Sequence, residues 1–172
     1  HRVGISPNHL TILGFLLTAG VSLLLAQGYF RLGGVLLVLT SLCDGLDGLV
    51  ARAAGKTSRF GAHLDSSLDR YAEGVIFLGL LIYYSRVGSV TDTILVFVAL
   101  IASYMVSYTR ARAEGLGLDC NVGILTRLER LVILILGLIL NQMRLALWAI
   151  AILANVTAVQ RMIHVWLQKE GE

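Results

Sequence analysis

Four of the six aspartates of this chain fall within one stretch of 26 residues: Asp44, Asp47, Asp65 and Asp69. If the stretch is helical, the first two are three residues apart and the last two are four apart, so each pair projects from one helix face. Carboxylates that converge from two helices repel one another unless a cation neutralises them. Hard oxygen ligands without His or thiolate suit Mg²⁺ or Mn²⁺. The spacing therefore predicts a divalent-metal site built from these four carboxylates.

Small and basic residues lie between the two pairs, namely Gly48, Arg52, Gly55, Lys56, Arg59 and Gly61. Glycines let a ligand approach the backbone, and basic side chains can bind phosphate. The stretch is thus typical of a metal–phosphate site. The alternative, in which the acids only cap or pair at helix ends, leaves unexplained why carboxylates stand beside strongly apolar segments.

The composition indicates an integral membrane protein. Hydrophobic residues make up 56% of the 172 residues and charged residues 15%, whereas a soluble domain carries about 25% charged residues. Two cysteines are too few for a disulfide framework. We expect one domain over residues 1–172 and, because the chain starts at His1 and not at a methionine, an incomplete N-terminus.

Six apolar segments can be read along the chain, and they predict an all-α protein with six transmembrane helices. They span about 9–27, 31–50, 64–85, 91–113, 128–140 and 143–167. The fifth is short for a full span of about 20 residues. The first carboxylate pair lies near the end of the second segment, and the other pair at the start of the third.

The distribution of Lys and Arg predicts the orientation. Eleven of the 14 lie at the two termini, in the 51–64 and 111–127 loops or at the flanking helix ends. The opposite side holds only Arg31, Arg86 and Arg144. By the positive-inside rule, both termini and the motif loop face the cytoplasm, in a multi-pass protein of the cell membrane.

The aspartate stretch also resembles a known signature. It reads Asp44-x-x-Asp47-Gly48-x-x-Ala51-Arg52, eight residues, then Gly61-x-x-x-Asp65-x-x-x-Asp69. This pattern is similar to that of the CDP-alcohol phosphotransferases, with every fixed position present. We expect the six helices to enclose a cytoplasm-facing polar cavity. The resemblance implies a CDP-linked lipid as donor, release of CMP, and a homodimer.

The same resemblance implies roles for individual residues. Two Mg²⁺ ions on the aspartates would clamp the diphosphate of the donor, and Asp69 would take the proton from the acceptor hydroxyl. The donor would be bound by Gly48, Ala51, Arg52, Thr57, Ser58 and Gly61. The donor lipid is CDP-diacylglycerol or an ether-lipid analogue.

A second basic cluster points to the acceptor. Charged residues inside apolar segments cost free energy and usually serve a purpose. Here three arginines come from three segments: Arg110, which is close to Ser107 in the sequence, Arg130 and Arg161. They predict a site for a second phosphate and so a phosphorylated polyol. The alternative for Arg110 is an ordinary helical salt bridge with Glu114.

The stretches SYTRARAEGLG, ERL and QR near the end resemble the phosphatidylinositol-phosphate synthase branch, which uses inositol 1-phosphate. That branch typically has lysine at the position of Arg110, and archaeal relatives that make ether lipids carry similar stretches. Glycerol 3-phosphate, giving phosphatidylglycerol phosphate, is the alternative acceptor. A divalent-cation transporter is disfavoured because the acids cluster at one end of two segments. No nucleic-acid partner is expected.

Overall fold

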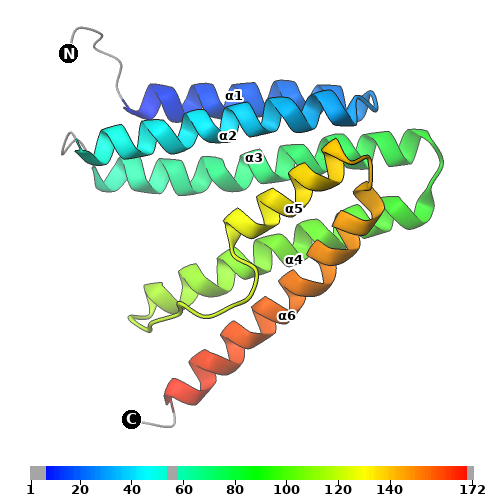
Figure 1. Ribbon diagram of the computed structural model, residues 1–172. Helices are drawn as coiled ribbons and strands as arrows, with labels where there is room; N and C mark the ends of the chain where they lie inside the picture. The colour runs from blue at the N-terminus through cyan, green and yellow to red at the C-terminus, as the bar shows by residue number, and fades with distance from the viewer. Residues whose placement is uncertain (1–6, 54–57, 170–172) are drawn as a thin grey trace, which may run out of the picture. The chain divides into compact units, whose positions relative to one another are not determined.

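The computed structural model describes the backbone of residues 7–53 and 58–169 and the side chains of residues 8–42 and 58–168. Within these ranges the chain forms six α-helices and no strand (Figure 1): α1 Pro7–Ala26, α2 Phe30–Ala53, α3 Arg59–Arg86, α4 Val90–Gly115, α5 Arg127–Ile139 and α6 Met143–Lys169. The predicted all-α architecture with six helices is confirmed. Contacts divide the chain into two compact units, 1–87 and 88–172. The single domain expected over residues 1–172 stays a prediction.

The start of α3 differs most from its predicted bound. The helix begins at Arg59 because Ser58 is its N-cap: the Ser58 hydroxyl oxygen accepts a hydrogen bond from the Gly61 amide at 2.9 Å. The apolar pattern on which the prediction rested begins only at Leu64. The polar first turn of α3 is therefore helical through its cap and not through hydrophobic periodicity.

Three of the described helices are long and apolar enough to cross a membrane, over Asn8–Ala26, Val90–Gly115 and Met143–Gln168. The part of α2 whose side chains are described, Phe30–Leu42, is a shorter apolar helix. The 13 residues of α5 span only about 20 Å at 1.5 Å per residue, less than the roughly 30 Å hydrocarbon core. The finding supports a membrane protein, and the crossing of all six helices stays a prediction.

In the first unit, α1 contacts both α2 and α3. The Ser22 hydroxyl of α1 donates a hydrogen bond to the Val75 carbonyl of α3. One turn further on, a Cβ at Gly79 would lie 2.4 Å from the Ser22 carbonyl oxygen. Glycine at this position is what lets the two helix backbones approach so closely, as is common between membrane helices.

In the second unit, α6 packs on α4 and α5. A cluster of small and branched side chains packs between these elements: Ala102 and Val106 of α4, Ala154 and Ala158 of α6, and Leu125 of the connection between α4 and α5. At the start of both helices, Arg144 donates two hydrogen bonds of 2.7 Å to the carboxylate of Asp92. Asp92 contacts Arg144 near the start of the two helices, and Val106 clusters with Ala158 further along both. The two helices therefore run in the same direction (Figure 1).

Candidate active site

The predicted metal ligands lie near the adjoining ends of α2 and α3. Asp44 and Asp47 are in the last three turns of α2, and Asp65 and Asp69 in the first three turns of α3. The two helices run in opposite directions (Figure 1) and are joined through residues 54–58. At 1.5 Å per residue, Asp47 and Asp65 each lie about 9 Å along their helix from that connection. Each pair thus stands at a similar distance along its helix from the connection.

The carboxylates of α3 form one stripe. Asp65, Asp69 and Glu73 follow at intervals of four residues, so they share one helix face. Asp65 is exposed, and the side chain of Asp69 is 20% exposed. Arg70 lies beside the stripe, with Nη2 3.9 Å from Asp69 Oδ2 and Nε 3.9 Å from Glu73 Oε2. Its cation balances part of the negative charge.

The donor atoms on this stripe fit the expected kind of metal. They are solvent-reachable carboxylate oxygens, which suit Mg²⁺ or Mn²⁺ better than zinc. Among the described side chains, no three His, Cys, Asp or Glu residues form a metal site. The predicted ligand set also needs Asp44 and Asp47, whose side chains lie outside the described residues. These four ligands therefore stay a prediction.

Two of the predicted donor-binding residues have defined surroundings. Ser58 uses its hydroxyl as the cap of α3, and a Cβ at Gly61 would lie 3.0 Å from Ser58 Oγ and 3.3 Å from Asn8 Oδ1. Gly61 therefore sits where a larger residue would have to displace its neighbours. The backbones of Gly48, Ala51 and Arg52 belong to α2 without a description of their side chains, and Thr57 lies outside the described residues.

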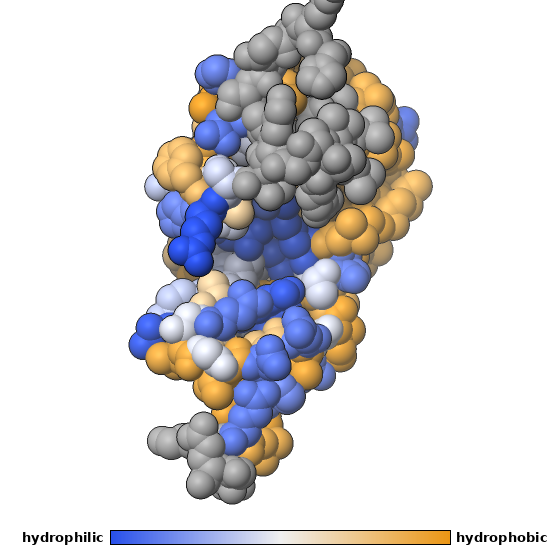
Figure 2. Space-filling model, turned by 90° about the vertical axis from the view of Figure 1, so that its left-hand side faces the viewer, coloured by the Kyte–Doolittle hydropathy of each residue, from blue (hydrophilic) through white to orange (hydrophobic). Residues whose placement is uncertain are grey.

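The second unit contains a buried polar cluster. Arg130 and Arg161 are only 2% and 3% exposed. Arg130 Nη2 donates to Ser107 Oγ at 3.4 Å, and Arg161 Nη1 donates to the carbonyl of Val106, the neighbour of Ser107. Both arginines therefore meet the same turn of α4. Figure 2 shows hydrophilic side chains gathered at the end of this unit where α4 and α6 finish, with hydrophobic ones along its flanks.

Arg110 differs from the other two arginines. Its side chain is 46% exposed, and Nε donates to Glu114 Oε1 at 2.8 Å, while Nη2 donates to Asn121 Oδ1 at 3.3 Å. The helical salt bridge weighed as its alternative role is thus formed. A phosphate-binding role for Arg110 stays a prediction, and it would require the guanidinium to share its hydrogen bonds.

Sequence reasoning overlooked the loop that joins α4 to α5. Thr157 on α6 is fully buried and accepts a hydrogen bond from the Leu125 amide of this loop at 3.0 Å. Arg161, one turn later, donates from Nε to the Val122 carbonyl at 2.9 Å. The signal available in the sequence was a threonine four residues before an arginine inside an apolar segment, which places both on one helix face.

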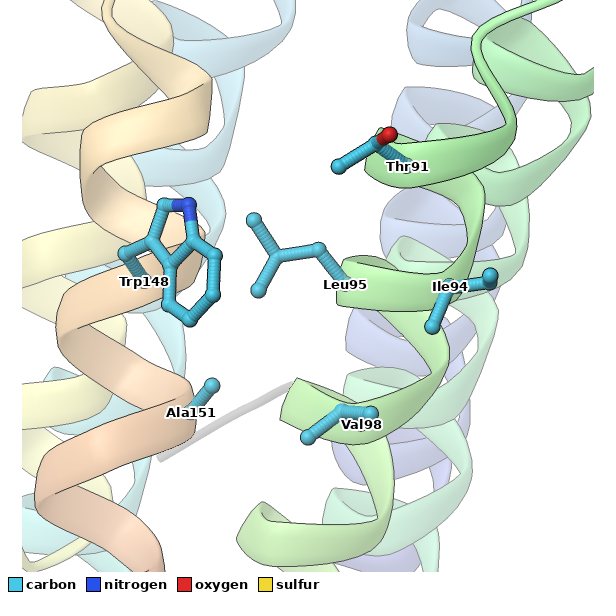
Figure 3. Close-up of a pocket in the computed structure, with 6 residues that line it drawn as sticks. All are labelled: Thr91, Ile94, Leu95, Val98, Trp148 and Ala151. Carbon is cyan, nitrogen blue, oxygen red and sulfur yellow. The ribbon is translucent and has the colours of Figure 1, made fainter.

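The helices α4 and α6 also line an apolar hollow of ≈ 230 Å³ (Figure 3). Its lining residues are Thr91, Ile94, Leu95, Val98, Trp148 and Ala151. None of the predicted site residues contributes to it. Its lining carries no charged side chain and is mostly apolar, so it suits hydrocarbon better than a phosphate.

The chain is similar to known proteins over nearly its whole length. The family model of the CDP-alcohol phosphatidyltransferases matches residues 4–166. The archaetidylinositol phosphate synthase of Methanothermobacter thermautotrophicus is 37% identical over 96% of this chain and 85% of its own length. The phosphatidylinositol phosphate synthase of Mycobacteroides abscessus is 36% identical over 94% of this chain and 77% of its own length.

Solved structures show the same similarity. The crystal structure of Mycobacterium tuberculosis phosphatidylinositol phosphate synthase with CDP-DAG bound has a TM-score of 0.90 and 34% identity, covering 96% of this chain and 88% of that one. The same enzyme in complex with manganese and citrate has a TM-score of 0.88 at 34% identity, covering 96% and 84%. A family model that spans most of the chain and relatives above 30% identity over nearly its full length show that this chain is an enzyme of the CDP-alcohol phosphatidyltransferase family.

Proposed function

We propose that this enzyme transfers a phosphatidyl group, or its ether-lipid counterpart, from a CDP-linked lipid to inositol 1-phosphate and releases CMP. The observation that carries the acceptor is the pair of buried arginines, Arg130 and Arg161, on one turn of α4. Buried cations in a chain with apolar membrane helices call for an anionic ligand. One relative is named archaetidylinositol phosphate synthase and another phosphatidylinositol phosphate synthase. Both names give a lipid that carries inositol phosphate, which supports the same acceptor here.

The motif half of the chain binds the donor. Asp44, Asp47, Asp65 and Asp69 hold two divalent ions, and Arg52 with the small residues Gly48, Ala51 and Gly61 receives the CDP moiety beside Thr57 and Ser58. When bound, the ions neutralise the diphosphate and stabilise charge on the leaving oxygen. A manganese-bound structure of a relative supports a divalent cation in this role.

The reaction is a displacement at phosphorus. The hydroxyl oxygen of the acceptor attacks the phosphorus attached to the lipid, the bond to the CMP oxygen breaks, and CMP leaves with the electron pair. Asp69 accepts the proton of the hydroxyl. The position of Asp69 supports this role, because it is half-buried on the carboxylate stripe, four residues from the predicted metal ligand Asp65.

The acceptor phosphate is bound by Arg130 and Arg161 together with Ser107 and Arg110. A guanidinium offers paired N–H donors that match phosphate oxygens. Glycerol 3-phosphate carries the same phosphate, so the arginines alone do not separate the two acceptors. The separation must come from groups that bind the ring hydroxyls.

The experiment that tests the function is CMP release by purified enzyme with CDP-diacylglycerol and Mg²⁺. Inositol 1-phosphate, glycerol 3-phosphate, free inositol and serine are supplied in parallel. Release with inositol 1-phosphate alone is the expected result. Release with glycerol 3-phosphate would keep the reaction and replace the acceptor, whereas release with an unphosphorylated alcohol would remove the phosphate-binding role of the arginines.

The orientation is also a proposal: all six helices lie in the membrane, and the motif and both termini face the cytoplasm. It is supported by the excess of Lys and Arg at that side. Single cysteines replacing the exposed Gln142 and Leu116, in a background without Cys43 and Cys120, test it. An impermeant maleimide should label position 142 from outside and position 116 only after permeabilisation. Light scattering in detergent tests the expected homodimer.

A further inference from the structure

The connection between α4 and α5 runs along α6 in the opposite direction. Gln168 Nε2 donates to the Asp119 carbonyl at 2.8 Å, Arg161 Nε donates to the Val122 carbonyl at 2.9 Å, and Thr157 Oγ1 accepts from the Leu125 amide at 3.0 Å. Three positions along α6 thus hold three positions of the connection, in reverse order. We call these contacts the α6 clasp.

The clasp is closest at Gly123. The backbone of this glycine has φ +129°, a conformation that residues with a side chain rarely adopt. A Cβ there would lie 2.5 Å from Thr157 Cγ2 and 3.3 Å from Arg161 Nε. Both the methyl and the hydroxyl of Thr157 therefore contact the connection. Thr157 is fully buried and Leu125 is 2% exposed, so water does not replace this hydrogen bond.

The end of the clasp is the start of α5. Directly after Leu125, the Thr126 amide donates to Glu129 Oε2 at 2.8 Å and forms the N-terminal cap of α5. Arg130 is the next residue, in the first turn of this helix, and reaches Ser107 on α4. The direction in which α5 starts, and with it the position of Arg130, depends on where Leu125 is held.

Two nitrogens of the Arg161 guanidinium are already engaged by backbone carbonyls. Its Nε and Nη1 both donate to backbone carbonyls, those of Val122 and Val106. A guanidinium has five N–H donors in a fixed plane. Arg161 therefore joins α4, the connection and α6 through two of its nitrogens, and any ligand must share the remaining N–H groups.

We propose that Thr157 is a positioning residue for the acceptor site: together with Arg161 it holds residues 122–125 on α6 and thereby fixes Arg130 beside Ser107. The inference rests on the proposed function, since it assigns Thr157 a part in binding the acceptor phosphate. Thr157 does not touch the acceptor. It acts through the Leu125 amide and the capped start of α5.

The test replaces Thr157 by Val, which keeps the methyl contact with Gly123 and removes only the oxygen. The buried Leu125 amide then has no hydrogen-bond acceptor, so the start of α5 and with it Arg130 should shift. We expect the KM for inositol 1-phosphate to rise about tenfold. The kcat and the KM for the CDP-lipid should stay within about twofold. Thr157→Ser restores the hydroxyl and should return the acceptor KM to near the wild-type value.

The matched control is Thr18→Val. Thr18 is also buried, at 5% exposure, but its hydroxyl donates to the Gly14 carbonyl of its own helix at 2.9 Å. This variant should leave both KM values unchanged. A second readout needs no substrate: hydrogen exchange of the Leu125 amide should be faster in Thr157→Val than in the wild type and in Thr157→Ser.

The outcomes separate the two proposals. A wild-type enzyme that releases no CMP with any phosphorylated acceptor would overturn the proposed function and this inference with it. If the wild type is active, three results for Thr157→Val would overturn the positioning role alone. These are an unchanged KM for the acceptor, a fall in kcat together with a rise in the KM of both substrates, or an unchanged exchange rate of the Leu125 amide.

Discussion

Arg144 and Asp92 form a bidentate ion pair in which the two partners are very unequally buried. Both guanidinium contacts measure 2.7 Å, yet the side chain of Asp92 is 5% exposed and that of Arg144 is 64% exposed. Ser89 donates a further hydrogen bond of 2.6 Å to the same carboxylate. The carboxylate has thus lost most of its water, whereas the guanidinium keeps its own.

This asymmetry predicts that the two partners are not equally important for stability. Arg144→Ala leaves a buried carboxylate without its cation and should cost about 3–5 kcal/mol. Asp92→Asn leaves a guanidinium that water can solvate and should cost less than half as much. Thermal unfolding in detergent measures both. Equal losses of Tm would mean that Arg144 is as desolvated as Asp92.

A second stability prediction concerns two glycines. A Cβ at Gly79 would meet the Ser22 carbonyl oxygen at 2.4 Å, whereas one at Gly20 would have nothing within 4 Å. Gly79→Ala should therefore force α1 and α3 apart and cost about 1–3 kcal/mol. Gly20→Ala should be neutral or stabilise by up to about 1 kcal/mol, because alanine favours the helix. The same unfolding assay compares them, and a harmless Gly79→Ala would contradict the close helix contact.

Removal of Arg130 tests the acceptor site. A hydrogen bond to a charged group contributes about 1.5–3 kcal/mol, so Arg130→Ala should raise the KM for inositol 1-phosphate about 10- to 100-fold. The KM for the CDP-lipid should not change. Arg112→Ala, at an exposed arginine two residues beyond Arg110, is the control. An unchanged acceptor KM in Arg130→Ala would place the second phosphate elsewhere.

Asp69→Asn removes the proposed base while keeping the size of the side chain. Loss of a general base lowers kcat about 10²- to 10⁴-fold. Binding of the CDP-lipid, measured by calorimetry, should be largely retained because Asp44, Asp47 and Asp65 remain as ligands of the ions. Asp119→Asn serves as the control because that exposed carboxylate belongs to neither site. Full turnover by Asp69→Asn would assign the proton transfer to another group.

Metal removal tests the aspartate ligands as a set. Chelation with EDTA should abolish CMP release, and Mg²⁺ or Mn²⁺ should restore it because both prefer oxygen ligands. Zinc prefers His and thiolate and should not restore full activity. Activity that survives chelation, or full activity with zinc, would contradict the carboxylate site.

The helices and the kind of enzyme could be predicted from the sequence, because both are marked by local patterns. Apolar runs located six helices, and the spacing from Asp44 to Asp69 indicated a metal site. The start of α3 was misplaced, since it depends on the cap at Ser58. The family similarity then confirmed the kind of enzyme.

Hydrogen bonds from side chains to backbone groups far away in the sequence could not be predicted from the sequence. The sequence indicated that Arg161 is unusual, but its hydrogen bonds go to the carbonyls of Val106 and Val122, and every residue has a carbonyl. No side-chain pattern marks which carbonyl an arginine will reach. Thr157 and Leu125 were overlooked for the same reason, since their contact joins a side chain to an amide 32 residues away.

The two cross-links between α4 and α6 constrain insertions and deletions in this part of the chain. Asp92 contacts Arg144 and Val106 contacts Arg161, so the two parallel helices are held at both ends. One residue added between Arg144 and Arg161 would turn Arg161 by about 100° and shift it by about 1.5 Å. Arg161 would then lose its hydrogen bonds to the Val106 and Val122 carbonyls, and its guanidinium would leave the buried cluster. The exposed residues between these arginines can change in identity, but their number is fixed.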